Sequence, residues 1–212
     1  MIHCIGDSHV CFFSGQDKIC DDPYLNFRPH RIGAYLAYSL GNPEHDAFKK
    51  LMSTISGLPK EDYVMLSFGE IDIRVHVVKQ AEKQNRTIES VISEIVDSYS
   101  IAINCVLNTG RKVIIWCPIP TCNHYDPSAD VSAENPFPHI GKIEERNQAN
   151  LYFLESLKNS VPEEVILLDL YKELINENMT SKGEYFMDGV HLSQKVMPMI
   201  LEKFRKALPN AL

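Results

Sequence analysis

The stretch from Ile2 to His9 reads IHCIGDSH, an apolar run followed at once by a glycine, an acid, a serine and a histidine. The run Ile2–Ile5 has the length and the continuous apolar character of a short strand that is buried on both faces. Ser8 would then follow the end of the first strand, where its hydroxyl can project from the sheet edge. This stretch predicts a buried first strand that ends in a turn able to carry chemistry.

Three further apolar runs have the same character, and helical periods separate them. The runs are Tyr63–Phe68, Lys112–Cys117 and Val165–Asp169. Helices are expected over about 45–55, from the N-cap Thr87 to near Gly110, over about 142–158, and over about 196–208 with Pro198 in the first turn. Because strands and helices alternate, the crossovers should be right-handed. We therefore predict an α/β fold with a mostly parallel, doubly wound sheet.

Two segments are less regular. Ile32–Leu40 is compatible with a short strand and a turn that lead into a helix. Residues 118–141 are rich in Pro, Asp, Asn and Ser and follow the end of a predicted strand. Such long loops are usually functional or disordered, and ligands bind beyond the strand ends of open α/β sheets. We favour a substrate-side loop over a disordered one. Its aromatic and imidazole side chains are His124, Tyr125, Phe137 and His139.

The composition favours a single soluble domain over residues 1–212, since the chain has no repeat or linker. A formal net charge of −7 argues against a nucleic-acid partner. No apolar run approaches the roughly 20 residues of a membrane span, and no secretory signal opens the sequence, so we expect a cytoplasmic protein. The six cysteines lack CxxC spacing, which favours buried thiols over disulfides or a zinc site.

The two ends of the chain together predict serine-dependent acyl chemistry. Near the C-terminus, Asp188 and His191 are three residues apart, just ahead of the predicted final helix. His191 could take the proton of Ser8, while Asp188 would accept the other ring N–H and fix the tautomer. Taken alone, Asp7-Ser8 is more typical of a strand-end turn or a helix cap, and most D-x-x-H matches are ordinary loops. Their joint placement favours a nucleophilic Ser8.

On these residues the chain resembles the GDSL/SGNH hydrolases, through blocks at its start, middle and end. The resemblance implies a flavodoxin-like three-layer α/β/α sandwich and a triad of Ser8, Asp188 and His191. It also implies an oxyanion hole made by the Ser8 N–H, a second-block glycine and a third-block asparagine. Gly33 is the best match for that glycine, and Gly41 is the alternative. The resemblance implies no cofactor and no metal.

The third block departs from this pattern, because it reads GEIDIR over residues 69–74 and places Ile71 where the asparagine is expected. Losing one oxyanion donor typically costs about 10²–10³ in turnover. Arg74 is the candidate replacement donor, and His76 is a weaker one. Glu70 and Asp72 would then orient the arginine or anchor the serine loop, with Asp7 in a supporting role. A structural ion-pair cluster is equally compatible with these residues.

The resulting hypothesis is a serine esterase that acts on a small-molecule or glycan ester, with an O-acetylated sugar favoured over a long lipid chain. One alternative is an acyltransferase that uses the same triad with a sugar hydroxyl in place of water. Another is a catalytically weak carbohydrate-binding member of the fold, because Ile71 replaces a donor of the oxyanion hole. Arg146 and Asn147, which open a predicted helix, could reach the substrate or form a solvated helix start, and we favour the solvated helix start.

Overall fold

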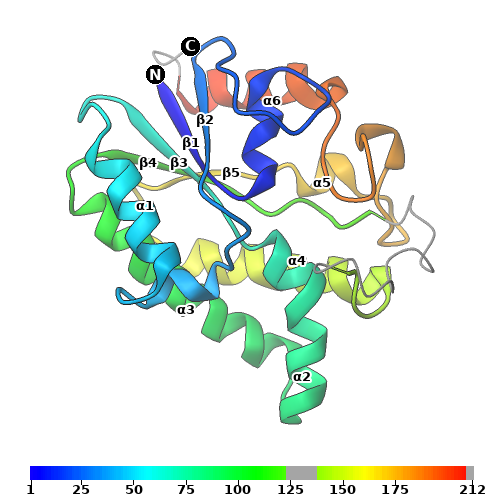
Figure 1. Ribbon diagram of the computed structural model, residues 1–212. Helices are drawn as coiled ribbons and strands as arrows, with labels where there is room; N and C mark the ends of the chain where they lie inside the picture. Colours follow the sequence, from blue (N-terminus) through cyan, green and yellow to red (C-terminus); the bar gives the residue numbers. More distant parts are fainter. Residues whose placement is uncertain (123–137, 209–212) are drawn as a thin grey trace.

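A five-stranded sheet lies at the centre of the computed structural model, which describes residues 1–122 and 138–208 (Figure 1). All of its strand pairs are parallel, and the strand order is β2-β1-β3-β4-β5. The strands are β1 (Ile2–Gly6), β2 (Phe27–Arg31), β3 (Tyr63–Ser67), β4 (Lys112–Trp116) and β5 (Ile166–Leu168). The predicted α/β fold with a parallel, doubly wound sheet is confirmed.

Helices cover both faces of this sheet and give three layers (Figure 1). One layer holds α1 (Asp46–Ser56), α3 (Ile88–Leu107) and α4 (Ile143–Ser160), with α2 (Val78–Gln84) beyond it. The other holds the 3-10 helix η1 (Ser8–Ser14), α5 (Tyr171–Leu174) and α6 (Met197–Ala207). Short turns complete the described elements: η2 (Tyr38–Gly41), the π-helical η3 (Asp72–Val77), η4 (Gly183–Tyr185) and η5 (Gln194–Val196).

The central strands send alternate side chains into two separate cores. On β3, Val64 and Leu66 pack with the α1, α3 and α4 side, whereas Met65 packs with η1 and α6. All three side chains are fully buried. This two-sided burial is the physical reason for the continuous apolar runs in the sequence.

The carboxyl end of β1 lies at a topological switch point. β1 pairs with β2 on one side and with β3 on the other, so that Gly6 is opposite both Arg31 and Ser67. A Cβ on Gly6 would lie 2.2 Å from the Ser67 carbonyl oxygen, so this strand end requires glycine. Open α/β sheets bind ligands at such a point, and Ser8 follows directly.

The prediction for Ile32–Leu40 is wrong. The strand of this region is β2, which ends before Ile32, and η2 is only a short 3-10 turn. β2 reads FRPHR, without an apolar run, because it is an edge strand with only one hydrogen-bonded neighbour. Edge strands accept proline and charged side chains such as Pro29, Arg28 and Arg31. The other predicted helices and strands are confirmed, including the Thr87 cap and the position of Pro198.

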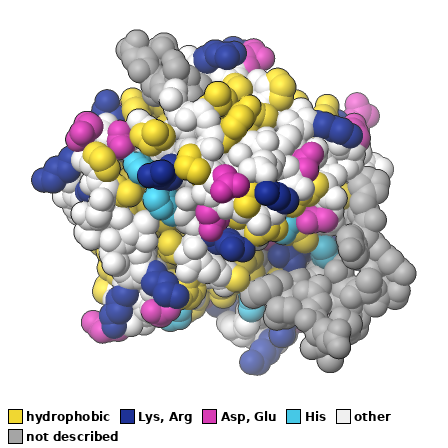
Figure 2. All heavy atoms as spheres, turned by 45° about the horizontal axis from the view of Figure 1, so that its top comes forward, with side chains coloured by type: hydrophobic (Ala, Val, Ile, Leu, Met, Phe, Trp, Pro, Cys, Tyr) yellow, Lys and Arg dark blue, Asp and Glu magenta, His cyan; other side chains and the backbone are white. Residues whose placement is uncertain are grey.

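Among the described helices, α3 is long and apolar enough by length and composition to cross a membrane. The core helix of a globular protein meets the same test, and α3 packs Ile92, Tyr99 and Ile103 into the core. All six cysteines are free thiols, and four of them are buried. On the face that Figure 2 shows, basic side chains lie among acidic ones rather than in one patch. The loop predicted over 118–141 falls largely on residues 123–137, outside the described part of the chain.

Candidate active site

Ser8 lies in the turn that joins β1 to η1. β1 ends at Gly6, and the side chain of Asp7 caps η1 by accepting a hydrogen bond from the His9 N–H at 2.9 Å. Ser8 is therefore the first residue of η1, with its half-buried side chain beyond the strand end. The cap fixes the backbone on both sides of the serine.

The structure brings Ser8 together with the D-x-x-H residues, 183 positions away in the sequence. Ser8 Oγ lies 2.7 Å from His191 Nε2, and His191 Nδ1 lies 2.8 Å from Asp188 Oδ2. The other carboxylate oxygen, Asp188 Oδ1, accepts hydrogen bonds from the backbone N–H groups of Val190 at 2.7 Å and of His191 at 2.6 Å. The predicted serine, histidine and aspartate thus form one continuous hydrogen-bonded chain.

The surroundings of Asp188 keep its carboxylate ionised, as the hydrogen bonds from Ser8 through His191 to Asp188 require. Burial raises the pKa of Asp188, but the hydrogen bond and charge of His191 and the two backbone N–H groups outweigh it and lower the pKa to about 2. The carboxylate is therefore ionised at neutral pH and accepts a hydrogen bond from His191 Nδ1–H. This assigns the tautomer in which Nε2 is free to accept the Ser8 proton.

The charged residues of the GEIDIR block are buried and paired with each other. Arg74 donates from Nε to Glu70 Oε1 at 2.6 Å and from Nη2 to Glu70 Oε2 at 3.1 Å. Both side chains are about 5% exposed. Burial raises the pKa of Glu70, but the charges of Arg74 and His9 and the Arg74 hydrogen bonds lower it overall. Two guanidinium nitrogens of the candidate oxyanion donor are thus directed at a carboxylate.

Asp72 ties the same block to the segment that follows β2. Its carboxylate accepts hydrogen bonds from the backbone N–H groups of Ala37 at 2.8 Å and Tyr38 at 3.2 Å. Burial raises the pKa of Asp72 to about 7, against the effect of these hydrogen bonds. Asp72 therefore anchors the loop that carries Gly33.

Gly33 lies two residues beyond β2, at the edge of the sheet where β1 ends. The Ile32 N–H donates to the Gly6 carbonyl at 2.9 Å, so the loop runs beside the turn of Ser8. The φ of Gly33 is +140°, a conformation that favours glycine. A Cβ on Gly41, in contrast, would meet the Ser98 backbone of α3 at 2.7 Å. Gly41 is thus explained by helix packing, and Gly33 is the better candidate for the site.

The third-block position provides no side-chain donor, because Ile71 is apolar and only 4% exposed. His76, the weaker candidate, is half-buried on η3, and burial lowers its pKa. In the described part of the chain no three His, Cys, Asp or Glu side chains group as a metal site requires.

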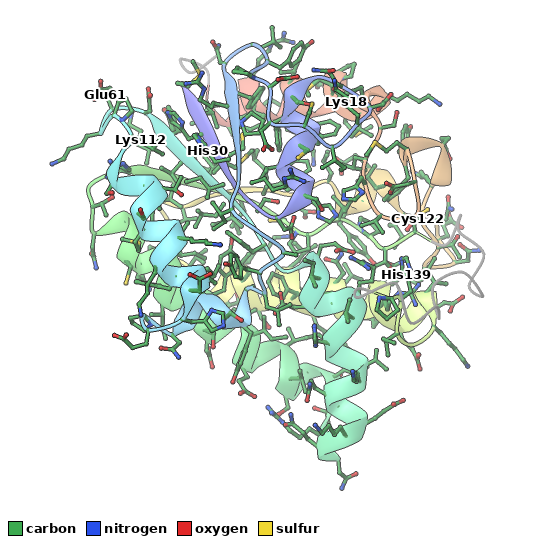
Figure 3. All side chains as sticks on the ribbon, in the orientation of Figure 1. Lys18, His30, Glu61, Lys112, Cys122 and His139 are labelled. Atoms are coloured by element: carbon green, nitrogen blue, oxygen red, sulfur yellow. The ribbon has the colours of Figure 1, made fainter. Side chains whose placement is uncertain are left out.

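A small cavity opens beside Ser8 and His191. Its volume is about 10 Å³, and its apolar lining includes Phe12, Trp116, Ile119, Met187 and Leu192. Gln16 and Lys18 contribute polar side chains to the lining. Figure 3 shows Lys18 on the loop after η1, while Cys122 and His139 flank the residues that the structure leaves undescribed. A cavity of this size holds about one water-sized group.

The interpretation of Arg146 and Asn147 as a solvated helix start is wrong, because both side chains are at most 2% exposed. Asn147 Oδ1 accepts from the Thr121 N–H at 2.8 Å, and its Nδ2 donates to the Met179 carbonyl at 2.7 Å. Arg146 Nε donates to Thr121 Oγ1 at 3.0 Å. The two side chains thus tie Thr121, in the segment after β4, to α4, and Asn147 also ties it to the loop of Met179.

Sequence reasoning also missed His9, whose ring lies against His191 with 5.0 Å between the ring centroids. A signal was present in the motif itself. The GDSL motif of the resemblance has leucine at its fourth position, where this chain has His9. A histidine that replaces an apolar residue and is buried needs polar partners.

The described fold is similar to many solved structures, although no family model and no curated protein matches the sequence. A protein from Slackia heliotrinireducens, provisionally named an SGNH hydrolase, has a TM-score of 0.54 at 12% identity, covering 98% of this chain and 97% of that one. A carbohydrate acetylesterase from Sinorhizobium meliloti has a TM-score of 0.52 at 15% identity, covering 100% and 99%.

An aryl esterase from M. smegmatis has a TM-score of 0.52 at 16% identity, covering 98% of this chain and 99% of that one. A member of the lipolytic G-D-S-L family from Veillonella parvula also matches over 99% of this chain, at 15% identity and a TM-score of 0.50. Each of these similarities extends over essentially the full length of this chain and of the compared chain. The chain therefore has the fold of the GDSL/SGNH hydrolases.

Proposed function

We propose that this protein is a serine esterase of the GDSL/SGNH kind that removes short acyl groups from a polar substrate. The observation that carries the proposal is the unbroken chain from Ser8 Oγ through His191 to Asp188, with contacts of 2.7 Å and 2.8 Å. A serine hydroxyl is a weak nucleophile until an adjacent base takes its proton. This arrangement supplies the base and the group that orients it.

In the proposed reaction, Ser8 Oγ attacks the ester carbonyl while its proton moves to His191 Nε2. The charged imidazole is stabilised by the ionised Asp188, which remains a carboxylate throughout. His191 then protonates the leaving alcohol, and the acyl group stays on Ser8. A water molecule, deprotonated by His191, attacks the acyl-enzyme and regenerates the free serine.

The negative charge on the carbonyl oxygen would be held by the backbone N–H groups of Ser8 and Gly33. Both residues lie at the carboxyl edge where β1 and β2 end. Ile71 adds no third donor, so turnover should be about 10²–10³ below that of a site with all three. If the missing donor lowered turnover still further, the protein would be the catalytically weak carbohydrate-binding member of the fold, which is the alternative function.

The cavity beside Ser8 supports a short acyl group. Its walls include Trp116 and Phe12, whose rings are nearly parallel with centroids 6.3 Å apart. An acetyl methyl is about the size of the water-sized group that the cavity holds, whereas a butyryl chain would need two more methylenes. A neighbour of the same fold acts as a carbohydrate acetylesterase, which supports an O-acetylated sugar as the substrate.

Hydrolysis of p-nitrophenyl acetate and butyrate tests this proposal. We expect acetate to be cleaved at least about tenfold faster, because a butyryl chain is larger than the cavity and would overpack it, and we expect Ser8→Ala to abolish both activities. Ser53→Ala, which alters an exposed serine on α1, is the matched control. Equal rates for Ser8→Ala and the wild type would refute the proposal. A stable acetyl-Ser8 that only a sugar alcohol releases would assign the acyltransferase reaction instead.

A further inference from the structure

His9 is a buried histidine that the proposed reaction does not use. It directly follows Ser8, and its side chain is 6% exposed. Its Nδ1 lies 2.9 Å from Asp7 Oδ1, the oxygen that also accepts the His9 backbone N–H. Asp7 itself is 1% exposed. One carboxylate therefore fixes both the backbone and the ring of His9.

The ring of His9 packs directly against the ring of His191. The two centroids are 5.0 Å apart, and the ring planes are inclined by 36°. Both histidines also line the cavity beside Ser8. The His191 side chain is 18% exposed. Part of its buried surface is covered by the ring of His9.

The opposite edge of His9 faces the GEIDIR block. His9 Nε2 lies 3.9 Å from Glu70 Oε2, and Glu70 is held in turn by its two hydrogen bonds from Arg74. His9 is thus placed between two buried carboxylates that come from different elements. Rotating its ring would separate it from Asp7, from Glu70 or from both.

The charged groups around His9 keep it protonated at neutral pH. Burial lowers its pKa and Arg74 opposes the charge, but the charge and hydrogen bond of Asp7 and the charge of Glu70 raise the pKa to about 9. The titratable groups that face it are Asp7 from the β1 turn, Glu70 and Arg74 from the third block, and His191 from the C-terminal loop. In this cluster, two carboxylates balance the charges of His9 and Arg74.

We propose that His9 is a positioning residue, which Asp7 and Glu70 hold so that its ring keeps His191 Nε2 aligned on Ser8 Oγ. This inference rests on the proposed esterase function. It also gives the substituted third block a second use, since Glu70 and Arg74 then brace the base of the reaction rather than bind the oxyanion. A displacement of about 1 Å in a catalytic group can lower turnover by about 10²-fold.

The substitution His9→Gln tests this role, since glutamine keeps a donor for Asp7 but removes the ring. With p-nitrophenyl acetate we expect kcat to fall about 10²-fold while KM stays within about twofold, because the reacting geometry is lost and not the substrate contacts. The wild type should lose kcat as pH rises through about 9, where His9 loses its proton. The variant should lack that alkaline loss. His30→Gln, at a β2 histidine that hydrogen-bonds His3, should behave as the wild type in both respects.

Wild-type kcat together with an unchanged alkaline loss in His9→Gln would overturn the positioning role. A wild type no more active than Ser8→Ala would instead refute the esterase function, so the two failures are distinguishable. If His9→Gln does not fold, the wild-type His191 Nδ1–H resonance decides by NMR. It should shift with a midpoint near pH 9, and a resonance that is constant from pH 7 to pH 10 would overturn the proposal.

Discussion

The relay side of the candidate site and its third-block side are built in opposite ways. The relay side joins Ser8 to Asp188 and His191 across the length of the chain, and these side chains are partly open to solvent. On the third-block side, Glu70 and Arg74 are four positions apart, nearly fully buried and paired with each other. The relay can therefore meet a substrate, whereas the third block mainly holds the protein together. Substitutions in the relay should therefore change mainly the activity, whereas substitutions in the third block should change mainly the stability, and the activity only through the contact of Glu70 with His9.

The largest expected effect is on turnover, for Asp188→Asn. An amide cannot hold His191 in the required tautomer or stabilise its charged form, so kcat should fall by about 10⁴. Steady-state hydrolysis of p-nitrophenyl acetate measures this. Glu202→Gln, at an exposed carboxylate that pairs with Lys206 on α6, is the control. A loss below tenfold in Asp188→Asn would contradict the relay.

The next effect is on stability, for Arg74→Met. Removing one partner of a buried ion pair leaves the Glu70 charge uncompensated, which costs about 3–5 kcal/mol. Urea unfolding followed by circular dichroism measures the loss, and the double variant Glu70→Met/Arg74→Met should recover most of it. If Arg74→Met instead kept its stability and lost about 10² in kcat while His9→Gln kept the wild-type kcat, the loss could not come through His9. Arg74 would then be the oxyanion donor, and the contrast between the two sides would fail.

A gain of function should follow from Ile71→Asn, which restores a side-chain amide at the third-block position. Since one oxyanion donor is worth about 10²–10³ in turnover, a restored donor should raise kcat at least about tenfold, even if imperfectly aligned. Ile71→Leu, which stays apolar, is the control and should show no gain. An Asn variant that folds and is no faster than the wild type would show that Ile71 does not stand at the oxyanion.

The smallest effect is the contribution of Asp188 to stability. Its folded-state pKa of about 2 lies below the ordinary value of about 3.9, so this contribution is present above about pH 4 and is lost as pH falls through 2. Because the side chain is 37% exposed, solvent screening reduces the contribution to roughly 1 kcal/mol. Unfolding of the wild type and Asp188→Asn should thus differ by that amount at pH 6 and converge below pH 2. A difference that persists well below pH 2 would assign it to packing.

Much of this architecture follows from local sequence patterns. The continuous apolar runs predict β1, β3, β4 and β5, because a strand that is buried on both faces has apolar side chains at successive positions. The GDSH and D-x-x-H motifs predict the two loops that meet at Ser8. β2 could not be predicted in this way, because it contains Arg28 and Pro29 and has no apolar run. These residues are tolerated because the strand lies at the edge of the sheet.

What the sequence hides is the pairing of polar groups across long separations. His9 and Glu70 are 61 positions apart, and nothing local shows that they meet. Asn147, which the sequence places at a helix start, is buried and hydrogen-bonds both Thr121 and Met179. Local patterns register apolar burial well, but a buried polar side chain is recognised only through its partners.

The central claim is that Ser8 is an activated nucleophile, and reaction of the native protein with a fluorophosphonate probe tests it most directly. Mass spectrometry of the digested product should find one equivalent of probe on Ser8. His191→Ala should remain essentially unlabelled, as should the urea-unfolded wild type. If the native protein labels no faster than the unfolded chain, or labels at another residue, Ser8 is not activated and the account is wrong.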